Sequence, residues 1–198
     1  MRETFMTGIN SVAVFCGSRL GSRPEFAGAA RQLGLGLGHA GIRLVYGGGR
    51  NGMMGVLADA VLEAGGTVLG VIPDFLTRSE VAHQGVTEMM VVNSMHDRKR
   101  RMAEAADAFV TLPGGIGTMD ETVEIISWRQ LRLHDKPIYL CDVAGSAASL
   151  VSAIDSMIAE GFAPSEAREF FKVVSGVPAL LELLGSAPRG TETAGARL

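Results

Sequence analysis

The sequence has few of the residues that build disulfide frameworks or metal sites. Only two cysteines, Cys16 and Cys141, occur in 198 residues, and they fit no CxxC spacing. Both end apolar, strand-like runs, which favours buried, reduced thiols over a disulfide or a metal site. The four histidines form no H-E-x-x-H pattern, so zinc binding has little support. We therefore expect no bound metal.

Long apolar stretches and a strong charge of one sign are also missing. No stretch reaches the roughly 18 apolar residues of a membrane span, and residues 1–10 show no signal peptide. The net charge of −3 gives no general reason to expect a nucleic acid or an anionic membrane as a partner. The expected location is the cytoplasm. The G-x-x-x-x-G-K-[ST] phosphate loop and the G-x-S-x-G nucleophile turn are absent too.

What is present indicates one folded nucleotide-binding domain. With 47% hydrophobic residues, the chain can bury a sizeable core. We expect a single α/β domain over residues 1–184 and a flexible tail, rich in Gly, Ala and Thr, over residues 185–198. The apolar runs predict strands at residues 11–16, 42–46, 67–72, 89–92, 108–112 and 137–141. Helical patterns lie between them, at residues 24–40, 53–64, 95–106, 118–133 and 147–160.

The alternation of continuous apolar strands and helices is typical of a parallel sheet covered on both faces. We therefore predict a doubly wound, Rossmann-like α/β fold with right-handed crossovers. Ligands of such sheets bind beyond the carboxyl ends of the strands. Gly17 and Ser18 follow the first strand, where backbone N–H groups and a hydroxyl can meet an anion. An ordinary turn between strand and helix explains this pair equally well.

A glycine-rich turn follows the second predicted strand. Gly47, Gly49 and Gly52 fit G-x-G-x-x-G and open a helix, whose N-terminus favours an anion. The pattern alone is weak evidence, because residues 36–41 repeat it. That copy precedes a strand and lies within a helical segment, so we interpret its glycines as small residues for helix packing.

The most informative turn follows the fifth predicted strand, where residues 113–121 read PGGIGTMDE. Its glycines expose successive N–H groups, and the Thr118 hydroxyl is expected to cap the next helix. Asp120 and Glu121 then lie in the first helical turn. They can simply complement the helix dipole, but an acid beside a phosphate-binding turn is also well placed to act on the sugar of a nucleotide.

A basic segment, residues 96–101, starts the helix after the fourth predicted strand. A solvated helix face is the plainer interpretation, and two i,i+4 ion pairs support it, Asp97 with Arg101 and Arg100 with Glu104. Arg98 and Lys99 lie nearest the ligand edge of the sheet, however. Cations at a helix N-terminus need an anionic partner, either a substrate phosphate or Glu121.

Three motifs in this order resemble the LOG family of cytokinin riboside 5′-monophosphate phosphoribohydrolases, which are often mislabelled lysine decarboxylases. The motifs are YGGGxxGMMG at residues 46–55, SMHDRK at residues 94–99 and PGGIGTxxE at residues 113–121. The resemblance covers roughly residues 11–162 and includes Glu80 and Ser127. It implies that water cleaves the N-glycosidic bond of an N6-modified adenosine 5′-monophosphate, leaving ribose 5-phosphate. It also implies a homodimer and no cofactor.

By this resemblance, Arg98 and Glu121 carry the catalysis. The residues expected to bind the substrate lie in the motifs and the turns around them: Glu80, Lys99, Gly114, Gly115, Ile116, Gly117, Thr118, Met119, Asp120, Ser127, Gly17, Ser18, Gly47, Gly48, Gly49 and Met54. The chain departs from the family after Gly145, where an aromatic pair is usual and Ser146-Ala147-Ala148 stands here. A packing contact or a contact to the base is therefore missing.

Three other functions compete with hydrolysis. Related α/β folds include molybdenum-cofactor carrier proteins, which bind a phosphorylated pterin without turning it over, although a carrier of an anion gains little from Glu121. A dinucleotide-binding oxidoreductase would use Gly47, Gly49 and Gly52, with Asp74 on a ribose, and leaves residues 113–121 unexplained. Lysine decarboxylation is not supported, because the sequence around the lysines shows no recognisable pyridoxal-phosphate site.

Overall fold

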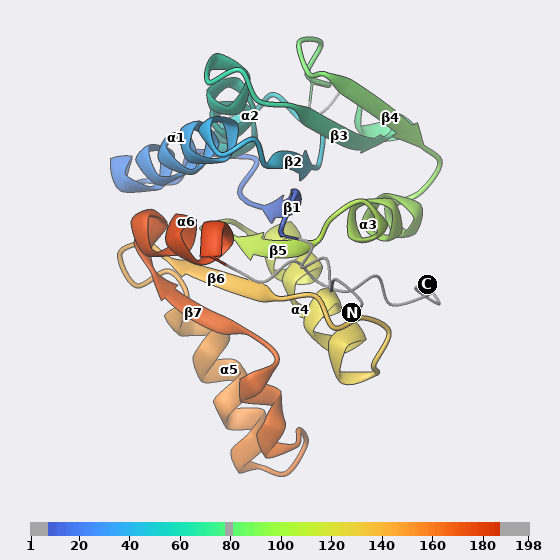
Figure 1. Ribbon diagram of the computed structural model, residues 1–198. Coiled ribbons are helices and arrows are strands. Elements are labelled where there is room, and N and C mark those ends of the chain that lie inside the picture. The colour runs from blue at the N-terminus through green and yellow to red at the C-terminus, as the bar shows by residue number, and fades with distance from the viewer. Residues whose placement is uncertain (1–7, 78–80, 187–198) are drawn as a thin grey trace, which may run out of the picture.

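The computed structural model describes residues 8–77 and 81–186 and contains a seven-stranded parallel sheet (Figure 1). The strands are β1 (Ser11–Phe15), β2 (Arg43–Tyr46), β3 (Val68–Pro73), β4 (Glu88–Val92), β5 (Ala108–Thr111), β6 (Ile138–Asp142) and β7 (Lys172–Ser175). The α-helices are α1 (Pro24–His39), α2 (Gly52–Glu63), α3 (Met95–Glu104), α4 (Ile116–Gln130), α5 (Ala148–Ala159) and α6 (Gly176–Ser186). Two 3-10 helices, η1 (Asp74–Leu76) and η2 (Ser165–Glu169), lie in the connections.

The strand order is β4-β3-β2-β1-β5-β6-β7, with every neighbouring pair parallel. The chain winds outward from β1 in one direction, then returns to the other side of β1 with β5. This reversal confirms the predicted doubly wound fold. It also places a crevice at the carboxyl ends of β1, β2 and β5, where such folds bind ligands.

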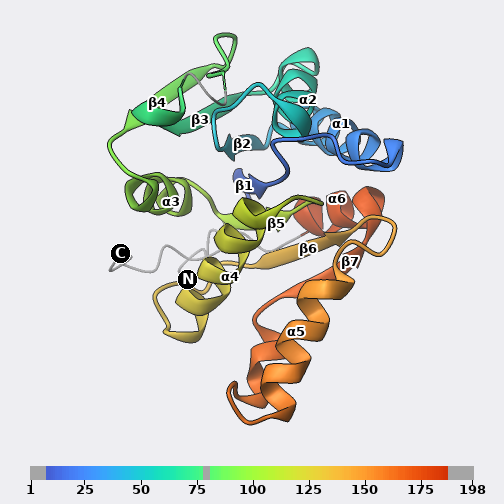
Figure 2. The ribbon, with the colours of Figure 1, turned by 180° about the vertical axis from the view of Figure 1, so that it is seen from behind.

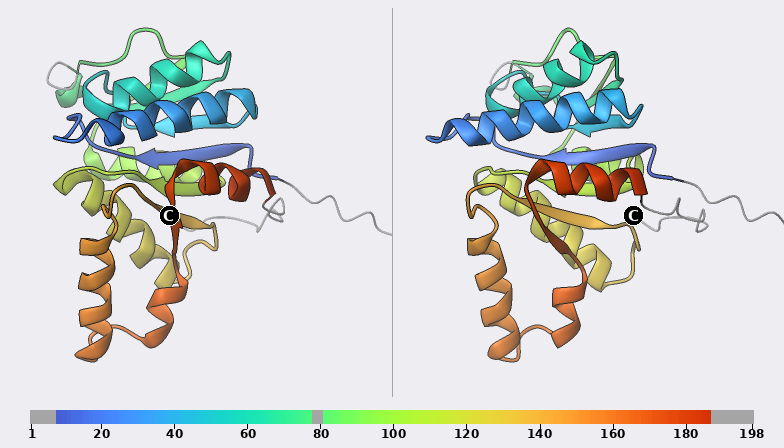
Figure 3. Two further views of the ribbon diagram at one scale, coloured as in Figure 1. Left: turned by 90° about the vertical axis from the view of Figure 1, so that its left-hand side faces the viewer. Right: turned by 60° about the vertical axis from the view of Figure 1, so that its left-hand side comes forward.

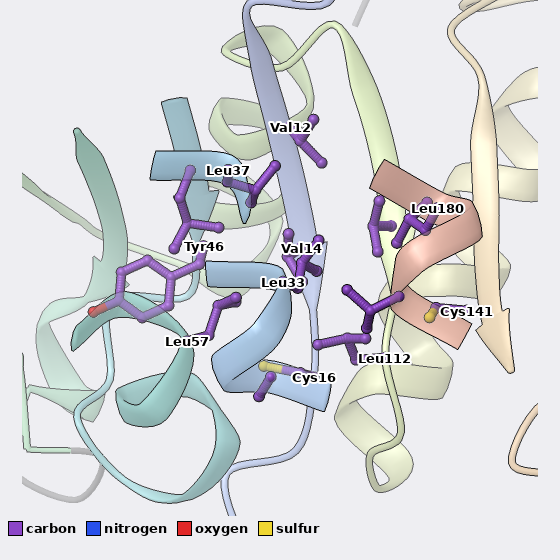
Figure 4. Packing of buried hydrophobic residues seen from close by; sticks show 14 of the residues in the cluster. Val12, Val14, Cys16, Leu33, Leu37, Tyr46, Leu57, Leu112, Cys141 and Leu180 are labelled. Atoms are coloured by element: carbon purple, nitrogen blue, oxygen red, sulfur yellow. The ribbon is translucent and has the colours of Figure 1, made fainter. Parts of the chain in front are cut away.

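Alternate side chains of β1 point to two hydrophobic cores, one on each face of the sheet. Val12 and Val14 pack under α1, α2 and α6, whereas Ala13 and Phe15 pack under α3, α4 and α5. Figure 4 shows the first core beside β1, and Figure 3 brings α1 and α6 in front of the sheet. In the view from behind, α4 lies between α3 and α5 (Figure 2). The predicted coverage of both faces is therefore confirmed.

Several local expectations are also met. Cys16 and Cys141 are buried, free thiols. Gly36 and Gly38 lie inside α1, where an added Cβ would overlap the Leu181 side chain of α6 or come within 2.6 Å of the Ala64 Cβ. Those glycines therefore serve close helix packing, as predicted. No helix among the described residues is long and apolar enough to cross a membrane.

The sequence patterns missed the last strand and helix of the fold. The strand β7 is short, and only Val174 of its four side chains is buried, so its apolar signal is weak. It pairs with β6 at the edge of the sheet, and α6 then packs back against α1. The tail expected over residues 185–198 begins inside α6, which ends at Ser186, and its remainder lies outside the described residues.

His134, just before β6, makes the stability of the fold depend on pH. Its ring lies against Phe109 and its Nε2 is 3.0 Å from the Ile125 carbonyl oxygen. Burial lowers the pKa of His134 from 6.5, although the hydrogen bond to Ile125 opposes this shift. Just below pH 6.5, the unfolded chain therefore binds more protons than the folded one, and stability falls as the pH falls.

We expect the free energy of unfolding to decrease between pH 7 and pH 5, and to decrease less in His134→Gln. Urea unfolding at several pH values measures both slopes. His39→Gln is the control, because His39 is exposed at the end of α1. Identical slopes for the wild-type protein and His134→Gln would contradict the assignment.

Candidate active site

The turns that follow β1 and β5 are joined to the start of α2 by backbone hydrogen bonds. The Gly17 N–H donates to the Pro113 carbonyl at 3.1 Å, and the Met53 N–H donates to the Gly17 carbonyl at 3.0 Å. A Cβ added to Gly17 would lie 2.9 Å from the Arg19 carbonyl oxygen and 3.3 Å from the Gly114 Cα. Only glycine allows the two turns to approach this closely.

The turn after β5 leaves the N-terminus of α4 open for an anion. The helix begins after Gly115, with no side-chain hydrogen bond capping it among the described residues. An added Cβ at Gly114 would overlap the Thr118 side chain, whereas one at Gly115 or Gly117 meets nothing within 4 Å. N–H groups of a first helical turn lack carbonyl partners within the helix, so they are available to a phosphate.

The predicted cap by Thr118 is wrong. Thr118 is the third residue of α4, its side chain is buried beneath Gly114, and its carbonyl oxygen accepts the Thr122 hydroxyl at 2.6 Å. Because Ile116 and Gly117 are already helical, the hydroxyl comes too late in the chain to cap the first turn. The Thr118 side chain therefore does not occupy the helix N-terminus, which leaves the candidate anion site open on that account.

Arg98 is a buried cation beneath the carboxyl ends of β2 and β3. The Ser94 side chain caps α3 by accepting the Asp97 N–H at 3.1 Å, which places Arg98 in the first turn. Only 4% of Arg98 is exposed, and its guanidinium donates to the carbonyls of Val71, at 3.1 Å, and Gly47, at 2.8 Å. A Cβ on Gly47 would overlap this guanidinium, which explains the glycine there.

Glu121 lies near the carboxyl end of β1, on the second turn of α4. The prediction that Asp120 and Glu121 lie in the first turn is wrong, because the helix already begins at Ile116. Burial raises the pKa of the Cys16 thiol, and the negative charge of Glu121 raises it further, so the carboxylate is close to this thiol. Cys16 directly follows β1, and Gly47 directly follows the neighbouring strand β2, in parallel register. Neighbouring strands are about 4.8 Å apart. Arg98, which donates to Gly47, and Glu121, which lies near Cys16, are therefore held next to the ends of two neighbouring strands.

Lys99 connects α3 to α4. Its Nζ is 3.1 Å from the Asp120 carboxylate and 3.1 Å from the Glu124 carboxylate. Burial lowers the pKa of Lys99, but the hydrogen bonds to Glu124 and Asp120 outweigh this effect and raise it overall. The lysine is therefore held charged at one side of the anion site. Glu124 was not among the predicted site residues, although its position one helical turn after Asp120 on α4 indicates that it lies on the same side of the helix.

The glycine turn after β2 is fixed by the segment that follows η1. The Arg50 N–H donates to Val81, at 3.0 Å, and the His83 N–H donates to Gly48, at 2.9 Å. His83 is buried, and its Nε2 is 2.9 Å from an Asp59 carboxylate oxygen. Val81 has a φ of 50°, a strained conformation for a β-branched residue. Glu80, which precedes it, lies outside the described residues.

A cavity of about 650 Å³ opens at the carboxyl ends of β1, β5 and β6 and collects seven of the predicted substrate-binding residues. They are Gly17, Ser18, Gly114, Gly115, Ile116, Thr118 and Met119. A second hollow on the outer side of α4 shares four of them and adds Asp120. Met54, in contrast, is buried in the core beneath α2, and Ser127 is exposed two turns beyond Asp120 along α4. Neither lines either of these two cavities.

Several named proteins are similar in sequence to this chain over most of its length. A protein-family model described as "Possible lysine decarboxylase" matches residues 54–184. A cytokinin riboside 5′-monophosphate phosphoribohydrolase of Arabidopsis thaliana is 43% identical over 93% of this chain and 86% of its own length. Another of that name, from Rhodococcoides fascians, is 46% identical over 77% of both chains.

Solved structures with the same fold include molybdenum cofactor proteins. The molybdenum cofactor binding protein of Rippkaea orientalis has a TM-score of 0.69 at 19% identity, and it matches 92% of this chain and 98% of its own. The molybdenum cofactor carrier protein of Chlamydomonas reinhardtii has a TM-score of 0.67 at 20% identity over 88% and 94% of the two chains. At such identities the likeness shows the fold alone. The identities above 40% decide the family: the chain belongs to the LOG family of cytokinin riboside 5′-monophosphate phosphoribohydrolases.

Proposed function

We propose that this protein hydrolyses the N-glycosidic bond of adenosine 5′-monophosphate or an N6-modified form of it, releasing the free base and ribose 5-phosphate. The observation that carries the proposal is the open N-terminus of α4, whose first residues line the cavity. Arg98, on α3, and Glu121, on α4, are not among the residues that line this cavity. In this proposal, phosphate binding and sugar chemistry lie a few residues apart on α4.

Glu121 is the proposed catalytic carboxylate. Cleavage at C1′ develops positive charge on the sugar ring, as in other glycosyl hydrolysis, and an ionised carboxylate stabilises this charge. The same carboxylate positions the attacking water and accepts its proton. Water thus supplies the new C1′ hydroxyl, and the base departs with a proton. Glu121 belongs to the helix whose N-terminus is proposed to hold the phosphate. The helix therefore fixes the distance between the carboxylate and the phosphate.

Arg98 is proposed to hold Glu121 ionised and to orient the nucleotide. A guanidinium stays charged at every physiological pH, and a nearby cation favours the ionised form of a carboxylate. Its Nε and one terminal nitrogen, Nη2, are already engaged by the carbonyls of Val71 and Gly47. These two bonds fix the plane of the guanidinium before the substrate binds. Little conformational entropy is therefore lost when the side chain engages the substrate.

The turn at residues 114–118 is proposed to bind the 5′-phosphate and to supply binding energy to the reacting carbon. Energy from a non-reacting group can be used to orient the reacting one, so substrates without it lose turnover. The test is to incubate the protein with adenosine 5′-monophosphate and with adenosine, and to measure free adenine by chromatography. Adenine should appear from the nucleotide only. Binding of the nucleotide without release would instead support a carrier of phosphorylated ligands.

We further propose that the protein is a homodimer, as the resemblance implies, and that the outer side of α4 lies in the interface. Ile116, Met119 and Val123 are 90%, 41% and 43% exposed there, beside the second hollow. They recur three or four residues apart, which forms one apolar stripe on the helix. Such a contact would place the partner subunit next to the phosphate turn. The cytoplasmic location stays a prediction.

We expect Val123→Glu to weaken the dimer at least about tenfold, because it brings two uncompensated charges into an apolar contact. Sedimentation velocity over a range of concentrations measures the change. Val91→Glu is the matched control, since Val91 is also exposed but lies on β4, at the far edge of the sheet. A wild-type protein that stays monomeric, or equal effects of both substitutions, would contradict the proposed interface.

A further inference from the structure

The 650 Å³ cavity continues past the phosphate turn to the side away from the catalytic pair. Its far part, which we call the α5 lobe, is lined by Phe26, Leu140, Cys141, Ser146, Ala147 and Leu150. These residues come from the start of α1, the end of β6 and the start of α5. Most are apolar, so this part of the cavity is suited to a group that is not charged.

The two sides of α4 face different parts of the candidate site. Lys99 of α3 reaches Asp120 and Glu124, which identifies the side of the helix that faces α3. Arg98 belongs to that same neighbouring helix. The α5 lobe lies on the opposite side, since α4 stands between α3 and α5 (Figure 2). A nucleotide with its phosphate on the turn and its sugar near Glu121 therefore extends toward α3 and leaves the α5 lobe empty.

The α5 lobe is held open by the turn that connects β6 and α5. The Ala147 N–H donates to Asp142, at 3.0 Å, and the Val143 N–H donates to the Ser146 hydroxyl, at 3.2 Å. Arg23 donates to the Ala144 carbonyl at 3.1 Å. These bonds fix the turn where two small side chains face the cavity. Ser146 and Ala147 have small side chains, which leaves room for a ligand in this part of the cavity.

We infer that the α5 lobe is a second subsite, which takes a small apolar or aromatic group carried on the 5′-phosphate of the substrate. The inference rests on the proposed function. It extends the substrate class from nucleoside 5′-monophosphates to phosphodiesters in which such a group is esterified to the 5′-phosphate. The reaction is unchanged: water adds its hydroxyl to C1′, the base leaves with a proton, and the product is ribose 5-phosphate that still carries the ester group.

The occupant follows from continuity with the phosphate turn. Three residues of the phosphate turn also line the cavity: Gly114, Gly115 and Thr118. A group attached to a phosphate held by this turn therefore enters the α5 lobe directly. A phosphodiester keeps one negative charge for the helix N-terminus. Its ester group then removes apolar surface from water against Leu140 and Leu150, which adds binding energy that a plain monophosphate lacks.

The test compares adenosine 5′-monophosphate with its phenyl ester in the wild-type protein, Ala147→Leu and Ala147→Phe. We expect the wild-type protein to release adenine from the ester with a kcat/KM at least equal to that for the monophosphate. Filling the lobe should lower kcat/KM for the ester by about tenfold in Ala147→Leu and more in Ala147→Phe. Turnover of the monophosphate should change less than about twofold, which also shows that the variants fold. Ala148→Phe is the control, because Ala148 is exposed and does not line the cavity.

Failure of the subsite is distinct from failure of the proposed function. If the wild-type protein hydrolyses the monophosphate but rejects the ester, or if the Ala147 variants lower both activities equally or leave both unchanged, the subsite is overturned. If it hydrolyses neither compound, the proposed function fails, and calorimetric titration decides the subsite alone. Tighter binding of the ester than of the monophosphate, lost in Ala147→Phe, supports it, and any other binding result refutes it.

Discussion

Glu121→Gln is expected to reduce adenine release from adenosine 5′-monophosphate by a factor of about 10² to 10⁴, the usual contribution of a general base or charge-stabilising carboxylate. The amide keeps the size of the side chain but can neither stabilise an oxocarbenium-like centre with a full charge nor accept a proton from water. Because the phosphate turn is untouched, nucleotide affinity should change little. The loss should therefore appear in kcat and not in KM.

Steady-state kinetics and calorimetric binding of the nucleotide separate these effects. Glu160→Gln is the matched control, since Glu160 is an exposed carboxylate at the end of α5. Undiminished turnover in Glu121→Gln would refute the catalytic assignment. Loss of nucleotide binding along with turnover would instead show that Glu121 supports the phosphate site.

Arg98→Lys is expected to lower kcat by about 10²-fold, although the positive charge is retained. The guanidinium donates to two carbonyls in fixed directions, and an ammonium group on a flexible stem cannot reproduce this fork. One of the carbonyls of Val71 and Gly47 would lose its partner, which costs about 1 to 3 kcal/mol in a buried place. Stability should therefore fall together with activity.

Urea unfolding and steady-state kinetics of the same samples test this prediction. Arg101→Lys is the control on the same helix, because Arg101 is half exposed and its ion pairs within the described ranges are with Asp97 and Glu104. A stable protein with full kcat would contradict the assigned role. A fall in stability with unchanged kcat would leave Arg98 as a purely structural residue.

The sheet was predictable because most of its strands can be recognised from their own apolar residues. The runs at β1, β2 and β3 are continuously apolar and separated by helical patterns, which a buried parallel sheet requires. The edge strand β7 was not predictable, since only one of its four side chains is buried and it is held by its pairing with β6 and its contact with α6. The apolar helix α6 was missed with it, because no strand had been recognised before it.

The site was predictable in position but not in its contacts. Residues that directly follow strands had to meet at one edge of the sheet, which identified Gly17, Gly47 and Gly114. The carbonyl partners of Arg98, and the pair of Asp59 with His83, depend on segments brought together by the fold. Thr118 was misplaced as a cap because two glycines before it allow either of two helix starts, and packing under Gly114 selects the earlier one.

The most direct test of the central claim is the product balance of a single reaction. Adenosine 5′-monophosphate should yield adenine and ribose 5-phosphate in equal amounts, measured by chromatography and by the phosphorus NMR signal of the sugar phosphate. Equal yields would confirm hydrolysis of the N-glycosidic bond. Release of inorganic phosphate with intact adenosine, or recovery of bound but unchanged nucleotide, would contradict it.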